Sequence, residues 1–184
     1  MWKVATSGGA PVALCDAQNP WGTSWGDDDQ ILYGQGPAGI WRVAGTSGTP
    51  ELIVELDDGE SAHGQQMLPG GEWILFTLLQ TGTGAWDSAQ IVAHSVSTGE
   101  RVVLLEGGRD ARYVDTGLII YSLNGVLFAI SFDLDNLAVR GGPVPLLQGI
   151  RTAGSATGAA QYGIARDGTL VYIPGGANAS SGLS

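Results

Sequence analysis

The side chains that could perform acid–base, nucleophilic or metal chemistry are few and scattered along this chain. His63 and His94 are the only histidines, so one chain cannot supply a multi-histidine zinc site, and no H-E-x-x-H motif occurs. The serine-nucleophile motif G-x-S-x-G is also absent. Cys15, the only cysteine, has no basic neighbour in the sequence to favour its thiolate, so we expect an inert thiol. The sequence therefore predicts no catalytic residues, no cofactor and no metal, and the chain is not expected to be an enzyme.

Two acidic segments have the residue types of a hard-cation site. Asp27, Asp28 and Asp29 follow one another, and clustered carboxylates are ligands that hard metals accept. The alternative, which we favour, is a solvated turn between two strands. Asp133, Asp135 and Asn136 alternate like the start of a calcium loop, but neither the glycine nor the distal glutamate of such a loop follows.

Four residues are candidates for ligand recognition. Arg109 and Arg112 flank Asp110, and two guanidinium groups could attract an anionic ligand or a peptide carboxylate. The alternative for both arginines is a local ion pair with Asp110 or with Asp115 nearby. His63 precedes a short predicted strand, where it could contact a ligand. The alternative for His63 is a purely structural role. Trp86 lies in the polar segment 80–88, where loops often carry binding contacts.

The composition excludes several other classes of protein. The chain has 184 residues, of which 43% are hydrophobic and 14% charged, so it is neither a disordered tail nor a coiled coil. Its net charge of −10 would repel nucleic acid, and its basic residues are too scattered to form a binding surface for phosphates. A single cysteine allows no internal disulfide. No apolar run is long enough to span a membrane, and the first residues lack the apolar core of a signal peptide, so the compartment stays open.

The elements that must position these residues are predicted to be strands. No segment keeps helical spacing of apolar residues without a Gly or Pro, and the 30 glycines fall between short apolar runs. The pattern predicts about sixteen short strands: 2–5, 11–14, 23–25, 30–33, 40–43, 51–56, 64–67, 72–78, 90–96, 101–105, 111–114, 118–122, 126–132, 144–148, 161–165 and 169–173.

Internal repeats organise these strands. Residues 2–11 read W-K-V-A-T-S-G-G-A-P and residues 41–50 read W-R-V-A-G-T-S-G-T-P, at a fixed offset of 39. A second unit recurs four times. It consists of an apolar residue, a short turn and a strand that ends in an aromatic residue, and its aromatic positions are Tyr33, Phe76, Tyr121 and Tyr172. A period of about 40 to 50 residues carrying four strands is typical of a β-propeller blade.

The count predicts an all-β propeller segment over residues 1–175. It comprises an outer half-blade at 2–14, three blades at about 19–56, 63–105 and 111–148, and an inner half-blade at 160–173, followed by a flexible tail at 176–184. The two half-blades either close a four-bladed ring or end an arc of a larger ring, and we favour the arc. In either case His63, Arg109 and Arg112 fall beside inner strands, near the mouth of the central channel.

Several segments resemble a known repeat family. They read D-A-R-Y-V-D-T-G-L-I-I-Y-S-L-N-G-V-L-F-A-I-S-F-D, A-A-Q-Y-G-I-A-R-D-G-T-L-V-Y-I-P-G-G and H-G-Q-Q-M-L-P-G-G-E-W-I-L-F-T. These segments are similar to the WD40-like, TolB-type propeller repeats found C-terminal to bacterial serine/threonine protein kinases. The resemblance covers about residues 2–175, although the turn at Gly26–Asp29 departs from the Pro-Asp-Gly turn common in the family. It implies a sensor module outside the cytoplasm, and this chain has no kinase motifs of its own.

The expected function is thus a non-catalytic binding or scaffold module. Its partner would be a protein or peptide, or another copy of the chain joined through the terminal half-blades, whose exposed strand edges invite pairing. Two alternatives stay open. One is the accessory propeller of a prolyl-oligopeptidase-type serine peptidase, which resembles these repeats as well; the other is a self-assembling propeller scaffold.

Overall fold

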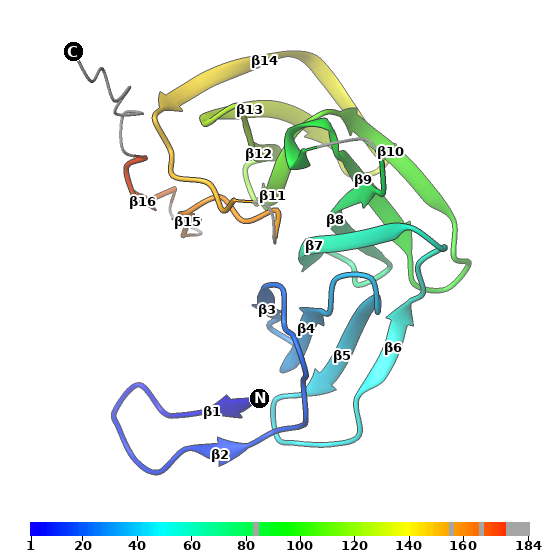
Figure 1. Cartoon of the computed structure of the whole chain (residues 1–184), viewed down its shortest axis with the longest axis vertical. Helices are drawn as coiled ribbons and strands as arrows, with labels where there is room; N and C mark the ends of the chain where they lie inside the picture. Colours follow the sequence, from blue (N-terminus) through cyan, green and yellow to red (C-terminus); the bar gives the residue numbers. More distant parts are fainter. Residues whose placement is uncertain (83–84, 155–156, 166–167, 176–184) are drawn as a thin grey trace, which may run out of the picture.

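The chain folds into antiparallel sheets arranged along an arc, as the computed structural model shows (Figure 1). The structure describes residues 1–82, 85–154, 157–165 and 168–175. In these ranges no helix has the length and apolar character needed to cross a bilayer. The predicted tail at 176–184 lies outside the described residues. The strands are β1 (Trp2–Lys3), β2 (Val12–Ala13), β3 (Thr23–Trp25), β4 (Gln30–Gly34), β5 (Ile40–Ala44), β6 (Glu51–Val54), β7 (Glu60–Met67), β8 (Trp73–Gln80), β9 (Gln90–Ser95), β10 (Arg101–Glu106), β11 (Arg109–Val114), β12 (Leu118–Leu123), β13 (Val126–Asp133), β14 (Ala138–Gln148), β15 (Tyr162–Ile164) and β16 (Leu170–Tyr172).

Three four-stranded sheets form the body of the arc. They are β3–β6, β7–β10 and β11–β14, and within each sheet every strand pairs antiparallel with the next strand in the chain. The two-stranded sheets β1–β2 and β15–β16 lie at the ends. The first strand of each sheet, β3, β7, β11 and β15, faces the centre of the arc (Figure 1). The predicted all-β fold of four-stranded antiparallel blades is confirmed, as an arc of a propeller.

Burial decreases from the middle of a blade to its outer edge. The central strand β8 carries the nearly continuous apolar run W-I-L-F-T-L-L, and Ile74 to Leu78 are buried because neighbouring blades cover both of its faces. The outer strand β14 is exposed along most of its length. Apolar residues of adjacent blades pack against one another, for example Leu32 of β4 with Phe76 of β8, and Leu75 of β8 with Ile119 of β12. The core therefore lies between blades.

Two inner strands begin earlier than their sequences predict. β7 starts at Glu60 and so contains His63, which was expected to precede the strand, and β11 starts at Arg109. Both strands have a shift in register, between His63 and Gln66 in β7 and between Arg109 and Arg112 in β11. A bulge of this kind inserts an extra residue and bends the strand, so the apolar alternation is interrupted and the strand appears shorter in sequence.

Candidate functional site

The backbone at Asp110 adopts a left-handed conformation in the bulge of β11. Its φ is +51°. Glycine occupies the equivalent position in the two preceding blades: Gly22 lies three residues before Trp25 and Gly64 three residues before Met67, and their φ values are +86° and +69°. Glycine adopts this conformation freely because it has no Cβ, and aspartate tolerates it better than most residues. Asp110 is thus a carboxylate at a place where the neighbouring blades have glycine.

The buried carboxylate of Asp110 joins three segments of the chain. Its Oδ1 lies 2.7 Å from Nη2 of Arg112 and 3.5 Å from Nε2 of His63, and its Oδ2 accepts a hydrogen bond of 2.9 Å from the backbone N–H of Ala160. Burial by itself raises the pKa of Asp110, but Arg112, His63 and the Ala160 N–H together outweigh burial and lower it. The carboxylate is therefore held in its ionised form.

The backbone of Asp110 is also bonded to neighbouring blades. Its N–H donates to Oγ1 of Thr77 on β8 at 2.9 Å, and its carbonyl accepts from the hydroxyl of Tyr162 on β15. That hydroxyl lies 3.1 Å from the carbonyl of Ile120 as well. The pKa of Tyr162 is raised, chiefly by burial and then by the negative charge of Asp110. Asp110 thus connects β7, β8, β11 and the segment around β15.

Side-chain amides and a guanidinium connect the inner strands to each other. The amide of Gln66 on β7 donates to the carbonyl of Tyr113 on β11 at 3.1 Å and accepts from its N–H at 2.9 Å, as a paired strand would. Arg112 donates to the carbonyl of Gly64 at 2.9 Å. Towards the other neighbour, Gln65 donates to the carbonyl of Gly22 at 2.8 Å. The inner strands of neighbouring blades are therefore joined by hydrogen bonds from side chains to the backbone rather than by a ladder of backbone hydrogen bonds.

Trp86 closes the centre of the arc at the beginnings of the inner strands. Its ring packs edge-on against Trp21 and His63, with centroid distances of 6.1 and 6.0 Å, and it lies against Gly158 so closely that a Cβ there would be 2.6 Å away. With 3% of its surface exposed, Trp86 does not offer the surface contact that its polar loop suggested. Residues Trp86–Ser88 form a short 3₁₀ helix in which the Trp86 side chain is buried.

Arg109 anchors that loop. Its guanidinium forms a bidentate ion pair with Asp87, one bond of which measures 3.0 Å, and the backbone N–H of Asn124 also donates to this carboxylate at 3.0 Å. The side chain of Arg109 is 5% exposed. The expected local pairing of Arg109 with Asp110 or Asp115 is therefore replaced by a long-range pair with Asp87, and Arg109 does not face solvent as a free cation.

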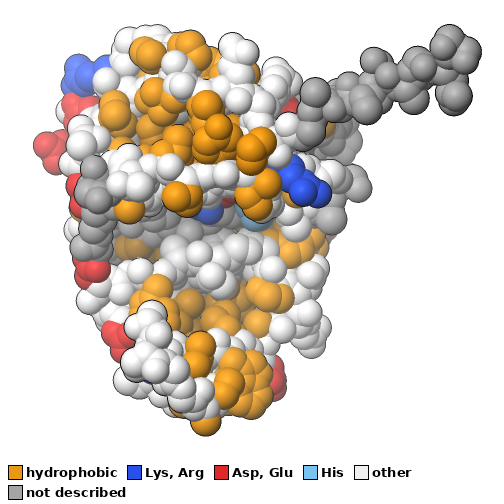
Figure 2. Space-filling model, turned by 90° about the vertical axis from the view of Figure 1, so that its left-hand side faces the viewer, with side chains coloured by type: hydrophobic (Ala, Val, Ile, Leu, Met, Phe, Trp, Pro, Cys, Tyr) orange, Lys and Arg blue, Asp and Glu red, His pale blue; other side chains and the backbone are white. Residues whose placement is uncertain are grey.

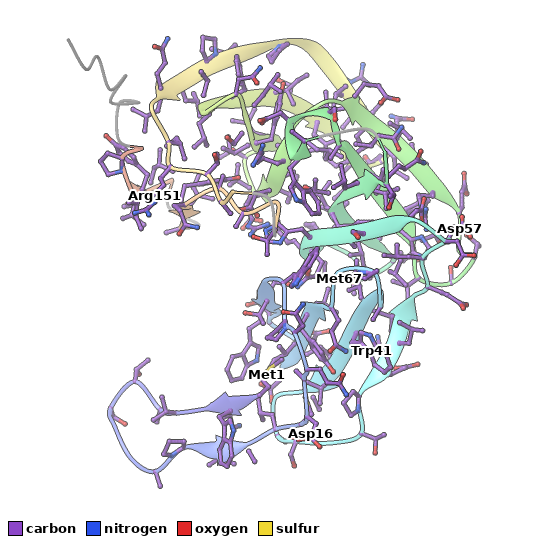
Figure 3. The ribbon with its side chains drawn as sticks, in the orientation of Figure 1. Met1, Asp16, Trp41, Asp57, Met67 and Arg151 are labelled. Carbon is purple, nitrogen blue, oxygen red and sulfur yellow. The ribbon has the colours of Figure 1, made fainter. Side chains whose placement is uncertain are left out.

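At the opposite ends of the inner strands lies an open cup. It is a cavity of about 780 Å³, and each of the strands β3, β7, β11 and β15 contributes to its wall. Figure 2 shows the molecule hollowed between two groups of hydrophobic side chains, and Figure 3 places Met67, one of the lining residues, at the centre of the arc. The residues that line the cup are Ser24–Asp28, Gln30, Leu32, Gln66–Gly71, Arg112–Asp115, Ile164 and Ala165.

The floor and the rim of the cup differ in chemistry. Gln66 and Arg112 lie deepest along their strands and are held by the bonds described above. Asp28 and Asp115 belong to the turns at the rim, and Trp25, which also lines the cup, is 54% exposed. The cup therefore has walls of mixed polar and apolar residues, with Gln66 and Arg112 beside Leu32, Met67 and Ile164, one exposed aromatic ring and an acidic rim.

The two acidic segments form hydrogen-bonded turns. Asp28 accepts from the N–H of Gln30 at 3.1 Å, and Asp29 accepts from Nε1 of Trp25 at 2.9 Å. Asp133 accepts from the N–H of Asn136 at 3.1 Å and is paired with Arg140, which lowers its pKa to about 2. Within the described ranges, no three His, Cys, Asp or Glu side chains converge as a metal site would require.

Of the predicted site residues, the structure brings His63 and Arg112 together on Asp110 and places Trp86 against His63. Arg109 lies apart, on Asp87. From the sequence alone, Asp110 is expected only as a counter-ion for its arginine neighbours. The signal that pointed to a larger role is its position in the repeat, three residues before Tyr113, where Gly64 precedes Met67 at the same spacing.

The comparisons with known proteins define the fold. No family model and no curated protein matches the sequence. The chain superposes on an oligogalacturonate lyase in complex with manganese with a TM-score of 0.53 and 14% identity, covering 74% of this chain and 40% of that one. It superposes on regucalcin, a calcium-binding protein from Agrobacterium tumefaciens, with a TM-score of 0.55 and 11% identity, covering 83% and 52%. The chain spans about half the length of these propeller proteins, and the similarity shows the fold alone.

Proposed function

We propose that this chain is a non-catalytic binding module whose ligand, a peptide or a loop of a partner protein, enters the cup. The observation that carries the proposal is the cup itself, to which all four inner strands contribute. Pockets at the centre of several elements are the usual ligand sites of folded domains. His63 and Asp110 are engaged in holding neighbouring strands together, which is a structural role.

The charges around the cup favour a basic ligand. Asp28 and Asp115 lie at the rim, the guanidinium of Arg112 is neutralised by Asp110, and the chain carries a net charge of −10. The Trp25 ring already carries a cation of the chain itself, because Nζ of Lys3 lies 5.9 Å from the ring centroid. A lysine or arginine side chain of the ligand would therefore be attracted chiefly by the carboxylates of the rim. The proposal requires no cofactor.

The resemblance to TolB-type repeats extends this proposal to the parent protein. In that setting the module would be the sensor region of a membrane-anchored bacterial serine/threonine kinase, outside the cytoplasm, and the peptide would be the signal that it detects. A kinase domain and a membrane span encoded upstream of this segment would support the extension. An α/β-hydrolase domain with a G-x-S-x-G motif in the same gene would contradict it.

The test is a binding measurement with peptides of matched length. Fluorescently labelled basic, neutral and acidic hexapeptides are titrated with the protein, and fluorescence anisotropy reports binding. We expect the basic peptides to bind most tightly and to weaken as salt is added. Trp25→Ala and Asp115→Asn should each weaken binding about tenfold, the loss of roughly 1.4 kcal/mol of contact energy.

The control is Val103→Ala, a substitution at an exposed residue of the outer strand β10, far along the blade from the inner strands. It should leave the affinity unchanged. Equal weakening by the control variant, or equal binding of acidic and basic peptides, would contradict the proposal.

A further inference from the structure

The two terminal hairpins are complementary halves of one blade. The repeat that relates residues 2–11 to residues 41–50 places β1–β2 at the position of β5–β6, the outer pair of a complete blade. The aromatic repeat places Tyr172 of β16 at the position of Tyr33 in β4, so β15–β16 correspond to the inner pair β3–β4. One hairpin therefore lacks an inner pair, and the other lacks an outer pair.

The inner half-blade exposes side chains that complete blades bury. Tyr172 is 43% exposed, whereas its equivalents Tyr33, Phe76 and Tyr121 are 0%, 0% and 4% exposed. Val171 beside it is 64% exposed. In the complete blades a further strand pairs along this edge and the next blade covers the face. The residue types at β16 are thus those of a buried strand.

The outer half-blade shows the same mismatch. Val4 follows β1 and is 57% exposed, whereas its equivalent in the repeat, Val43 of β5, is 2% exposed. Trp2 is 68% exposed. Only the other side of this hairpin is covered, where Leu14 joins the core of the first complete blade. An exposed apolar strand edge of this kind is a template for pairing with another strand.

Within the described residues, β1 and β16 are not paired with each other. The two strands lie on opposite sides of the gap in the arc (Figure 1). Figure 3 labels Met1 on one side of this gap and Arg151 on the other, and the backbone N–H of Arg151 donates a hydrogen bond to the carbonyl of Ile173, the residue after β16. The superposed parts, 74% and 83% of this chain, cover 40% and 52% of the two propeller chains. One chain therefore supplies only part of a ring of that kind.

We propose that a second copy of this chain fills both edges, so that β16 of each copy pairs with β1 of the other. Each junction completes a four-stranded blade, and the two junctions are related by a two-fold axis, which is the commonest symmetry of soluble oligomers. Three complete blades and two half-blades per copy close a ring of about eight blades, within the range that propellers adopt.

The register of the junction follows from the first complete blade. There Tyr33 of β4 pairs with Trp41 of β5, and Leu32 pairs with Arg42. The repeats translate these pairs into Tyr172 with Trp2, and Val171 with Lys3. The junction would bring the exposed rings of Tyr172 and Trp2 side by side across the strands, an arrangement that stabilises antiparallel pairs.

The first test is the mass of the full chain in solution, measured by light scattering after size-exclusion chromatography. We expect about 38 kDa, twice the 19.0 kDa of one chain. Val171→Lys places a charge on the proposed edge and should yield a monomer, whereas Val103→Lys, an equally apolar exposed position on the outer strand β10, should leave the dimer intact. A wild-type monomer, a heterogeneous larger assembly, or equal effects of both variants would overturn the proposal.

The second test does not depend on the folding of the lysine variant. In a Cys15→Ser background, Lys3→Cys combined with Val171→Cys should form disulfides between chains on mild oxidation, seen as a dimer band without reductant. Val4→Cys combined with Val171→Cys shifts the register by one residue and places the thiols on opposite faces, so it should cross-link poorly. A cross-link within one chain would show closure of a four-bladed ring and would overturn the proposal. Peptide binding by the cup is measured separately and can fail or succeed without this result.

Discussion

Replacing Asp110 by asparagine should be one of the most destabilising conservative changes in the chain. Asparagine keeps the shape of the side chain and tolerates the φ of +51°, so the substitution removes the charge and little else. It leaves the guanidinium of Arg112 and the imidazole of His63 without their carboxylate. Removing one partner of a buried pair costs about 3 to 5 kcal/mol, and because the side chain of Arg112 is 29% exposed we expect a loss of about 3 kcal/mol.

The assay is urea unfolding followed by circular dichroism at one fixed protein concentration. With a denaturant slope of about 2 kcal/mol per molar, a loss of about 3 kcal/mol lowers the midpoint by about 1.5 M. Asp110→Ala should cost about 1 to 2 kcal/mol more than Asp110→Asn, because alanine is strained at this φ.

The pH dependence provides an independent check. The pKa of Asp110 is lower in the folded than in the unfolded chain, so its ionised form stabilises the fold above the unfolded value of about 3.9, and this contribution disappears as the pH falls through the folded value. The difference between wild type and Asp110→Asn should be complete at pH 6 and shrink below pH 4. A loss under about 1 kcal/mol at pH 6, or an equal loss at pH 3, would refute the role assigned to this carboxylate.

Three further predictions concern packing and protonation. Gly64→Ala should destabilise the fold by at least about 2 kcal/mol, since its Cβ would lie 2.7 Å from a carboxylate oxygen of Asp110. Gly70→Ala, with φ of +92° and open space around it, should cost only the backbone strain of about 1 kcal/mol. Thermal unfolding of the two variants measures the difference. Burial lowers the pKa of His94, so stability should fall as the pH drops below about 6.5, and His94→Gln should flatten unfolding midpoints measured between pH 7 and 5. Gly158→Ala should displace the ring of Trp86 and change the near-ultraviolet circular dichroism, and an unchanged spectrum would contradict the packing described for that loop.

The strands were predictable from sequence because each is a short apolar run bounded by a turn, and every predicted strand occurs in the structure. The half-blades were visible in the repeat as well. The curvature of the arc was not, because curvature depends on how side chains space neighbouring blades. Strand counting therefore left open whether one chain closes a ring.

The burial and the partners of individual side chains depend on contacts with residues distant in sequence. Trp86 lies in a polar segment, yet its ring is buried because the fold brings Trp21, His63 and Gly158 around it. Asp110 has an arginine on each side in sequence, and only one of them, Arg112, is its partner in space. Local sequence shows which groups are near along the chain, whereas the bulge in β11 decides which way each one points.

The hydrogen bonds of Gln65 and Gln66 to neighbouring blades are made to main-chain groups, so they do not depend on which side chain the neighbouring strand carries. Gln66 bonds to the amide and carbonyl of residue 113, and Gln65 to the carbonyls of Gly22 and Leu32. Each contact survives a change of side chain in the adjoining blade. These hydrogen bonds alone therefore tolerate exchange of the side chains at residues 22, 32 and 113, whereas the apolar packing between blades still requires side chains that match across the interface.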